Sequence, residues 1–185
     1  MFKSNDQLDF VSNDLCTTWP PGMEVEVFKA SALADSSLRC IDSEIREGLY
    51  KPNTYQVLSQ EFQNLKLKVK SEIHKELMSG NKIAAYGASA SSTVLSYLLD
   101  INPHLSYIVD DNEFRQERLS PGYMIPIKSS SSLLVDQPSI VIITAWRFAE
   151  KIIDNNQSYL DAGGTFIVPL PNFEVISHAN RRTAI

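Results

Sequence analysis

The residues best suited to chemistry follow two apolar stretches near the middle of the chain. The first stretch is Ala84-Ala85-Tyr86, which is followed by Gly87 and a run of small and hydroxyl-bearing residues. The second stretch is Ile108-Val109, which is followed by Asp110-Asp111-Asn112. A glycine turn that leads into a helix presents free N–H groups to a phosphate, and an acid after the next strand can accept ribose hydroxyls. The pattern predicts a Rossmann-like unit that binds a phosphorylated ligand, although Gly87 stands alone in a motif that usually has more glycines.

Four segments are expected to meet at one edge of the predicted sheet, because each follows an apolar strand: residues 86–91, 110–112, 144–147 and 169–172. Open parallel sheets bind their ligands at this edge. The candidate ligand-binding residues are therefore Tyr86, Gly87, Ala88, Ser89, Ser91, Asp110, Asp111, Asn112, Trp146 and Arg147. The alternative is that Gly87 only makes a tight turn and the serines only cap the helix.

Within this set, we expect phosphates at the start of the helix that Ser89 opens, with the base or sugar toward the two acids and Trp146. Asp110 and Asp111 are adjacent, so their side chains should point in different directions and not act as one acid/base pair. Trp146 either stacks on a ligand or belongs to the core. Arg147 lies at a predicted helix start, where its charge opposes the helix dipole and favours an anion or an acidic partner.

Several function classes find no support in the composition. We identify no serine–histidine–acid arrangement, no phosphate-binding lysine loop and no activated cysteine, so no catalytic residue is predicted. Cys16, Cys40 and the three histidines lack metal-ligand spacing, and the net charge of −5 argues against nucleic acid as a partner. Without a membrane-spanning apolar run or signal-peptide pattern, we expect no membrane association and a cytoplasmic location.

The elements that position these residues alternate between strand and helix. A long amphipathic helix is expected over residues 54–78. Strands are predicted at 82–86, 105–109, 124–127, 139–144 and 164–169, with helices at 89–99, 147–160 and, capped by serines, 129–134. The alternation predicts an α/β fold, a three-layer Rossmann-like and mainly parallel sheet with helices on both faces.

The part before the long helix is expected to be organised differently. Residues 1–22 are polar and are expected to be mobile. Residues 23–28 alternate apolar and acidic side chains, which is typical of a half-exposed strand, and we expect residues 37–41 to pair with them. The predicted organisation is a polar segment (1–22), a short β-ribbon (23–53) and a Rossmann-like domain with its leading helix (54–185).

Between residues 37 and 175 the chain resembles the C-terminal domain of the S-adenosylmethionine-dependent sugar C-methyltransferases. The matching stretches are Ser37-Leu38-Arg39, the long helix, residues 83–90, residues 108–112, residues 121–127, Ala145-Trp146-Arg147-Phe148-Ala149-Glu150 and residues 163–171. The chain departs from the family at Ser91 and Ser92, where a lysine and a glycine are usual. It also departs at Arg147, where many members have asparagine, and at Asp35-Ser36, where a paired glycine is frequent.

The resemblance implies a domain that helps to hold a nucleotide-linked sugar and carries no redox cofactor of its own. Full-length relatives also have a zinc domain, a methyl-donor domain and a Tyr-His-Glu-His motif, none of which we find here. We therefore expect a sugar-nucleotide-binding or accessory domain of deoxysugar biosynthesis that does not methylate alone, and whether the chain is an enzyme stays open. S-adenosylmethionine is expected only if a partner domain supplies it. The expected partners are a nucleotide-linked sugar or another phosphorylated small molecule, together with either a methyltransferase partner chain or a second copy of this chain in a homodimer.

Two other interpretations of the function remain open. Gly87 and Asp110 have the order expected of a stand-alone NAD(P)- or nucleotide-binding Rossmann protein. A protein-interaction domain that kept the fold and lost its ligand is the other alternative.

Overall fold

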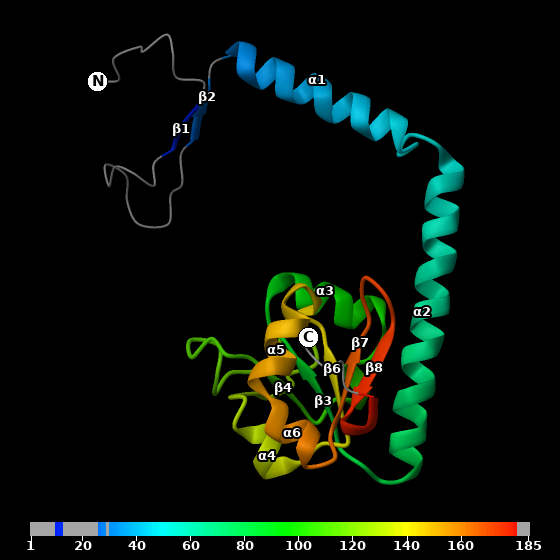
Figure 1. The fold of residues 1–185 in the computed structure, drawn as a ribbon, viewed down its shortest axis with the longest axis vertical. Coiled ribbons are helices and arrows are strands. Elements are labelled where there is room, and N and C mark those ends of the chain that lie inside the picture. Colours follow the sequence, from blue (N-terminus) through cyan, green and yellow to red (C-terminus); the bar gives the residue numbers. More distant parts are fainter. Residues whose placement is uncertain (1–9, 13–25, 29, 181–185) are drawn as a thin grey trace. The chain divides into compact units, whose positions relative to one another are not determined.

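The computed structural model describes residues 10–12, 26–28 and 30–180, and the chain divides into two compact units, Met1–Leu58 and Ser59–Ile185. In the first unit, β1 (Phe10–Ser12) pairs antiparallel with β2 (Glu26–Phe28), and α1 (Ala30–Arg46) follows (Figure 1). Apart from β1, the polar segment 1–22 lies outside the described residues.

The predicted pairing of residues 23–28 with 37–41 is wrong. Residues 26–28 do form a strand, but their partner is β1, and residues 37–41 lie inside α1. The sequence contains the reason, since Leu38, Ile41 and Ile45 recur at helical steps.

The second unit contains a six-stranded sheet in the order β5-β4-β3-β6-β7-β8, in which β8 alone is antiparallel to its neighbour. Its strands are β3 (Ile83–Tyr86), β4 (Tyr107–Val109), β5 (Ile127–Lys128), β6 (Ile140–Ile143), β7 (Thr165–Val168) and β8 (Glu174–Ser177). The strand order reverses between β3 and β6, which is the topological switch point of an open α/β sheet. The mainly parallel α/β fold is thus confirmed.

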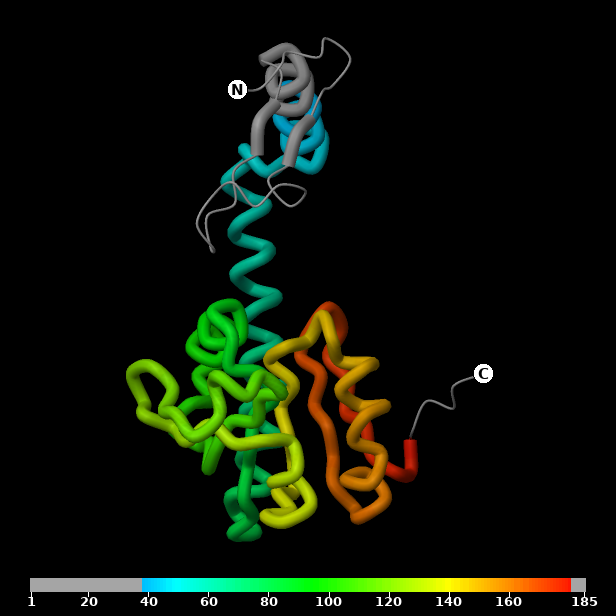
Figure 2. Tube along the Cα trace, turned by 90° about the vertical axis from the view of Figure 1, so that its left-hand side faces the viewer, coloured from blue at the N-terminus to red at the C-terminus, as the bar shows by residue number. Residues whose placement is uncertain are grey.

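Helices cover both faces of this sheet (Figure 2). They are α2 (Pro52–Met78), α3 (Ala90–Leu98), α4 (Ser132–Asp136), α5 (Ala149–Asn155) and α6 (Gln157–Asp161), with 3-10 turns η2 (Asn102–His104), η3 (Trp146–Phe148) and η4 (His178–Asn180). One core lies between the sheet and α2–α3, where Val69, Ile73 and Leu95 are buried. The other lies between the sheet and α4–α6, where Leu133, Ile152 and Leu160 are buried. The sheet is therefore the buried middle layer of three.

Several predicted boundaries differ from the structure. The helix expected over 147–160 is three shorter pieces, η3, α5 and α6, and it breaks at Asn156. The strand expected at 124–127 is β5, and only residue 127 falls in both ranges. Ser131 precedes α4 but makes no capping hydrogen bond through its side chain, so the predicted serine cap is wrong. Antiparallel β8 was not predicted.

No helix in the described ranges combines the length and apolar character needed to cross a membrane.

Candidate functional site

Gly87 makes the turn between β3 and α3, and the backbone there leaves no space for a side chain. Its φ is +116°, and a Cβ would lie 2.7 Å from the Cβ of Ala145 and 2.7 Å from the Oγ of Ser92. The Thr144 hydroxyl donates to the Tyr86 carbonyl at 2.9 Å and lies 3.1 Å from the Gly87 carbonyl oxygen. The loops that follow β3 and β6 are therefore in direct contact at the switch point.

The first turn of α3 has a side-chain cap and free backbone donors. Ser89 is the N-cap residue, and its hydroxyl oxygen accepts the N–H of Ser92 at 3.3 Å. The Ala88 N–H is bound to a carboxylate oxygen of Asp110 at 2.7 Å. The N–H groups of Ser89, Ala90 and Ser91 have no hydrogen-bond partner among residues that the structure describes. These three donors coincide with the positive end of the helix dipole.

Asp110 is buried, and its carboxylate is committed to the protein. Besides the Ala88 N–H, it accepts the N–H of Asn112 at 2.9 Å and the guanidinium of Arg115 at 3.2 Å. These bonds hold the Gly87 turn close to the end of β4. Asp110 therefore serves to position the loop.

Asp111 is exposed, and its carboxylate contacts a different group from that of Asp110, although both residues lie beyond the end of β4 and strand alternation does not apply to them. One of its carboxylate oxygens accepts the hydroxyl of Tyr86 at 2.7 Å. Burial and this carboxylate raise the pKa of Tyr86 above its usual value, so the phenol stays a hydrogen-bond donor. Asn112 uses its side-chain oxygen to accept the N–H of Phe114 at 3.0 Å, which closes the turn after β4.

Trp146 and Arg147 belong to η3, directly after β6. Trp146 is half-buried and packs against the core between the sheet and α2–α3. Arg147 is exposed, and its guanidinium carbon lies 5.2 Å from the centre of the Trp146 ring, within cation–π range. No carboxylate in the described part of the chain forms an ion pair with Arg147. Its charge is therefore available to an anion.

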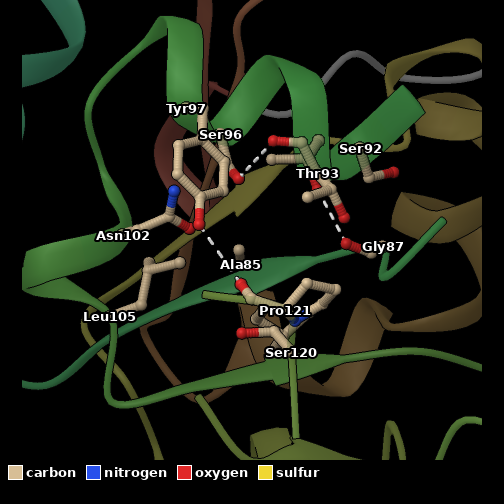
Figure 3. Close-up of a pocket in the computed structure, with 12 residues that line it drawn as sticks. Ala85, Gly87, Ser92, Thr93, Ser96, Tyr97, Asn102, Leu105, Ser120 and Pro121 are labelled. Carbon is tan, nitrogen blue, oxygen red and sulfur yellow. Dashed lines mark hydrogen bonds between the residues drawn. The ribbon is translucent and has the colours of Figure 1, made fainter. Parts of the chain in front are cut away.

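A small polar cavity lies under α3 and was missed by the sequence reasoning (Figure 3). Its volume is about 10 Å³. Its walls include five polar residues that are more than nine-tenths buried: Ser92, Ser96, Asn102, Ser120 and Thr144. A signal was present, since Ser92 and Ser96 are four residues apart and share the buried face of α3 with Leu95.

The structure brings some of the predicted site residues together in pairs and groups. Gly87, Ala88 and Ser89 meet Asp110, Tyr86 meets Asp111, and Trp146 stacks with Arg147. Ser91 is exposed beside Ser89. Within the described ranges, no group of three or more His, Cys, Asp or Glu side chains could hold a metal ion. The arrangement offers N–H donors, one uncommitted guanidinium and one exposed carboxylate, which suit a phosphorylated and hydroxylated ligand.

Comparison with known proteins agrees with this architecture. The family model of the C-methyltransferase C-terminal domain matches residues 22–171. A curated relative, C-methyltransferase NovU of Streptomyces niveus, is 28% identical over 170 residues, and the match covers 89% of this chain. The chain spans 40% of the length of that relative. Since the family model covers most of the sequence, the chain belongs to the C-methyltransferase C-terminal domain family.

Proposed function

We propose that this chain is a sugar-nucleotide-binding or accessory domain of C-methyltransferase type, that it acts in the cytoplasm in deoxysugar biosynthesis, and that it does not transfer methyl groups alone. The observation that carries the proposal is the group of N–H donors of Ser89, Ala90 and Ser91 at the switch point of the sheet, which have no partner among the residues that the structure describes. Helix N-termini of this kind bind phosphate through free N–H groups and the helix dipole.

Arg147 supports a phosphate at the same edge. It follows β6, the strand next to β3, and Ala145 in the same loop contacts the Gly87 turn. The Arg147 guanidinium has no carboxylate partner in the described part of the chain, and such a group favours phosphate through charge and through paired hydrogen bonds. By the resemblance, many family members have asparagine at this position, so Arg147 adds a charge that an amide would lack.

Asp111 is the acid that we assign to the sugar or ribose hydroxyls. Asp110 already accepts three protein donors, whereas the Asp111 side chain is exposed and makes one hydrogen bond among the described residues, to Tyr86. A carboxylate held by one donor can accept a ligand hydroxyl with its other oxygen. In this proposal Asp110 shapes the loop and Asp111 contacts the ligand.

The methyl donor belongs to a different part of the proposed assembly. NovU is described as a C-methyltransferase and is much longer than this chain, which spans 40% of it. We propose that S-adenosylmethionine is bound by a separate domain or partner chain. A homodimer is the alternative assembly, and analytical ultracentrifugation alone and with a candidate partner distinguishes the two.

The test of the phosphate site is the substitution Ser91→Glu, with Ser91→Gln as the matched control. Ser91 is preferable to Ser89, because Ser89 caps α3 and its loss would disturb the helix itself. A glutamate in the first turn of a helix is favourable for folding but repels a bound phosphate. At about 5 Å the repulsion is about 1–3 kcal/mol for effective dielectric constants between about 80 and 20, which weakens binding about 5- to 150-fold.

The measurement is calorimetric titration with thymidine diphosphate glucose. We expect weaker binding for Ser91→Glu and nearly unchanged binding for Ser91→Gln. Equal affinity in folded Ser91→Glu protein would remove the phosphate site. Binding of NAD in place of the sugar nucleotide would favour the dinucleotide alternative, and binding of neither would favour the interaction domain.

A further inference from the structure

The polar cavity under α3 contains hydrogen-bonding capacity that the protein leaves unused. Asn102 is 6% exposed, and its side-chain Nδ2 is buried without a hydrogen-bond partner in the described structure. Ser120 is 7% exposed. Its hydroxyl oxygen accepts the N–H of Ile125 at 3.1 Å, but its own proton has no acceptor among the described residues. A buried donor without a partner is costly, so each such group needs an explanation.

Acceptors lie in the same cavity wall. The Ser96 hydroxyl donates to the Thr93 carbonyl at 2.8 Å, and the Thr144 hydroxyl donates to the Tyr86 carbonyl at 2.9 Å. Each of these oxygens therefore keeps a lone pair for a further donor. Figure 3 shows Ser96, Asn102 and Ser120 around the cavity, from α3, η2 and the segment before β5.

The lining and the size together define what can bind. All twelve lining residues are uncharged, so the cavity has no counter-ion for a phosphate, carboxylate or ammonium group. A volume of about 10 Å³ is close to the smallest that holds one water molecule. The groups that remain are the two N–H hydrogens of the Asn102 amide, the Ser120 hydroxyl proton and lone pairs on the Ser96 and Thr144 oxygens. A single water can accept one N–H of Asn102 and the proton of Ser120, and can donate to the oxygens of Ser96 and Thr144. Water also suits the Asn102 amide in either orientation of its oxygen and nitrogen.

We propose that this cavity is a structural hydration site, occupied by one ordered water that Asn102 and Ser120 bind as donors and Ser96 binds as an acceptor. The water joins α3 to η2 and to the hairpin closed by the Leu119–Pro126 bridge. Tyr97 covers one side of the site, since its hydroxyl donates to the Pro121 carbonyl at 3.3 Å. Its ring also lies 5.6 Å from the ring of Tyr123.

The first test observes the water in the wild-type chain. We expect a high-resolution crystal structure to show one water within hydrogen-bonding distance of the side chains of Asn102, Ser120 and Ser96. Water-oxygen magnetic relaxation dispersion should detect a long-lived internal water in solution. A dry cavity in such a crystal structure would overturn the proposal.

The second test removes the amide with Asn102→Leu and uses Asn155→Leu, at an exposed position of α5, as the control. If the water is bound, the relaxation dispersion of Asn102→Leu should lack the contribution of one long-lived water, and its Tm should fall by at least about 2 °C. The control Asn155→Leu should keep the relaxation dispersion of the wild-type chain. If the amide is simply unsatisfied, its removal leaves the dispersion unchanged and keeps or raises the Tm, which refutes the proposal. Should Asn102→Leu fail to fold, the wild-type measurements decide.

Discussion

Replacement of Gly87 by alanine tests the contact between the two loops at the switch point. The added Cβ would lie 2.7 Å from the Ala145 Cβ, 2.7 Å from the Ser92 Oγ and 2.9 Å from the Ala145 nitrogen, so backbone atoms must move. The residue would also have to adopt a φ of +116°, which costs about 1–3 kcal/mol. Overpacking adds about 1–3 kcal/mol, and together the two terms lower the free energy of unfolding by about 2–6 kcal/mol.

The matched control is Gly163→Ala. Gly163 has a φ of +94°, but a Cβ at this position would have no atom within 4 Å, so the control carries the backbone strain without the overlap. For a chain of this size each kcal/mol shifts the Tm by about 2–4 °C, so Gly87→Ala should lower the Tm by about 4–24 °C and by more than the control does. Thermal and urea unfolding followed by circular dichroism measure both variants. Equal losses of stability in the two variants would refute the close approach at Gly87.

Two further predictions concern pH. The hydrogen bond from Lys70, at 2.6 Å, holds the pKa of Asp100 below its usual range, so its contribution to stability is present above about pH 4 and is lost below it. Asp100→Asn should reduce this acid-dependent loss in urea titrations, since asparagine tolerates the φ of +56° here, and an unchanged pH profile would contradict the assignment. At the other extreme, burial raises the pKa of Tyr86, Tyr107 and Tyr159 above the usual 10. Their contribution is present below about pH 10 and lost above it, so absorbance should show that they ionise together with unfolding, and not before it.

The central strands could be predicted because they are apolar on both faces. Residues 83–86 and 140–143 are fully buried between two helical layers, and continuous apolar runs are typical of parallel strands in such sheets. The N-terminal ribbon could not be predicted in the same way. Period-two alternation indicates that a segment is a strand but carries no information about its partner, and residues 37–41 were assigned to pairing although Leu38 and Ile41 follow helical spacing.

The proximity of the Gly87 turn to the residues after β4 could be predicted from the sequence, but the individual contacts between them could not. Strand ends identify an edge, so the acids after β4 could be placed near the Gly87 turn from topology alone. The different contacts of Asp110 and Asp111 depend on the Ala88 N–H and on the Arg115 side chain, which no spacing rule locates. The buried polar groups under α3 depend on η2 and the hairpin before β5, and these short irregular segments have no periodic pattern.

The sheet ends on one side at β5, which consists of Ile127 and Lys128. An open strand edge presents unpaired backbone donors and acceptors to any extended segment of another molecule, and this is how many sheet proteins begin to aggregate. At β5 these groups are already used, because the Ile127 N–H donates to the Arg118 carbonyl at 2.8 Å and the Ile127 carbonyl accepts the N–H of Glu117 at 3.0 Å. The edge also carries the charge of Lys128, which Asp136 holds in place at 2.7 Å. Growth of the sheet by intermolecular strand addition is therefore disfavoured along this side, both during folding and at high protein concentration.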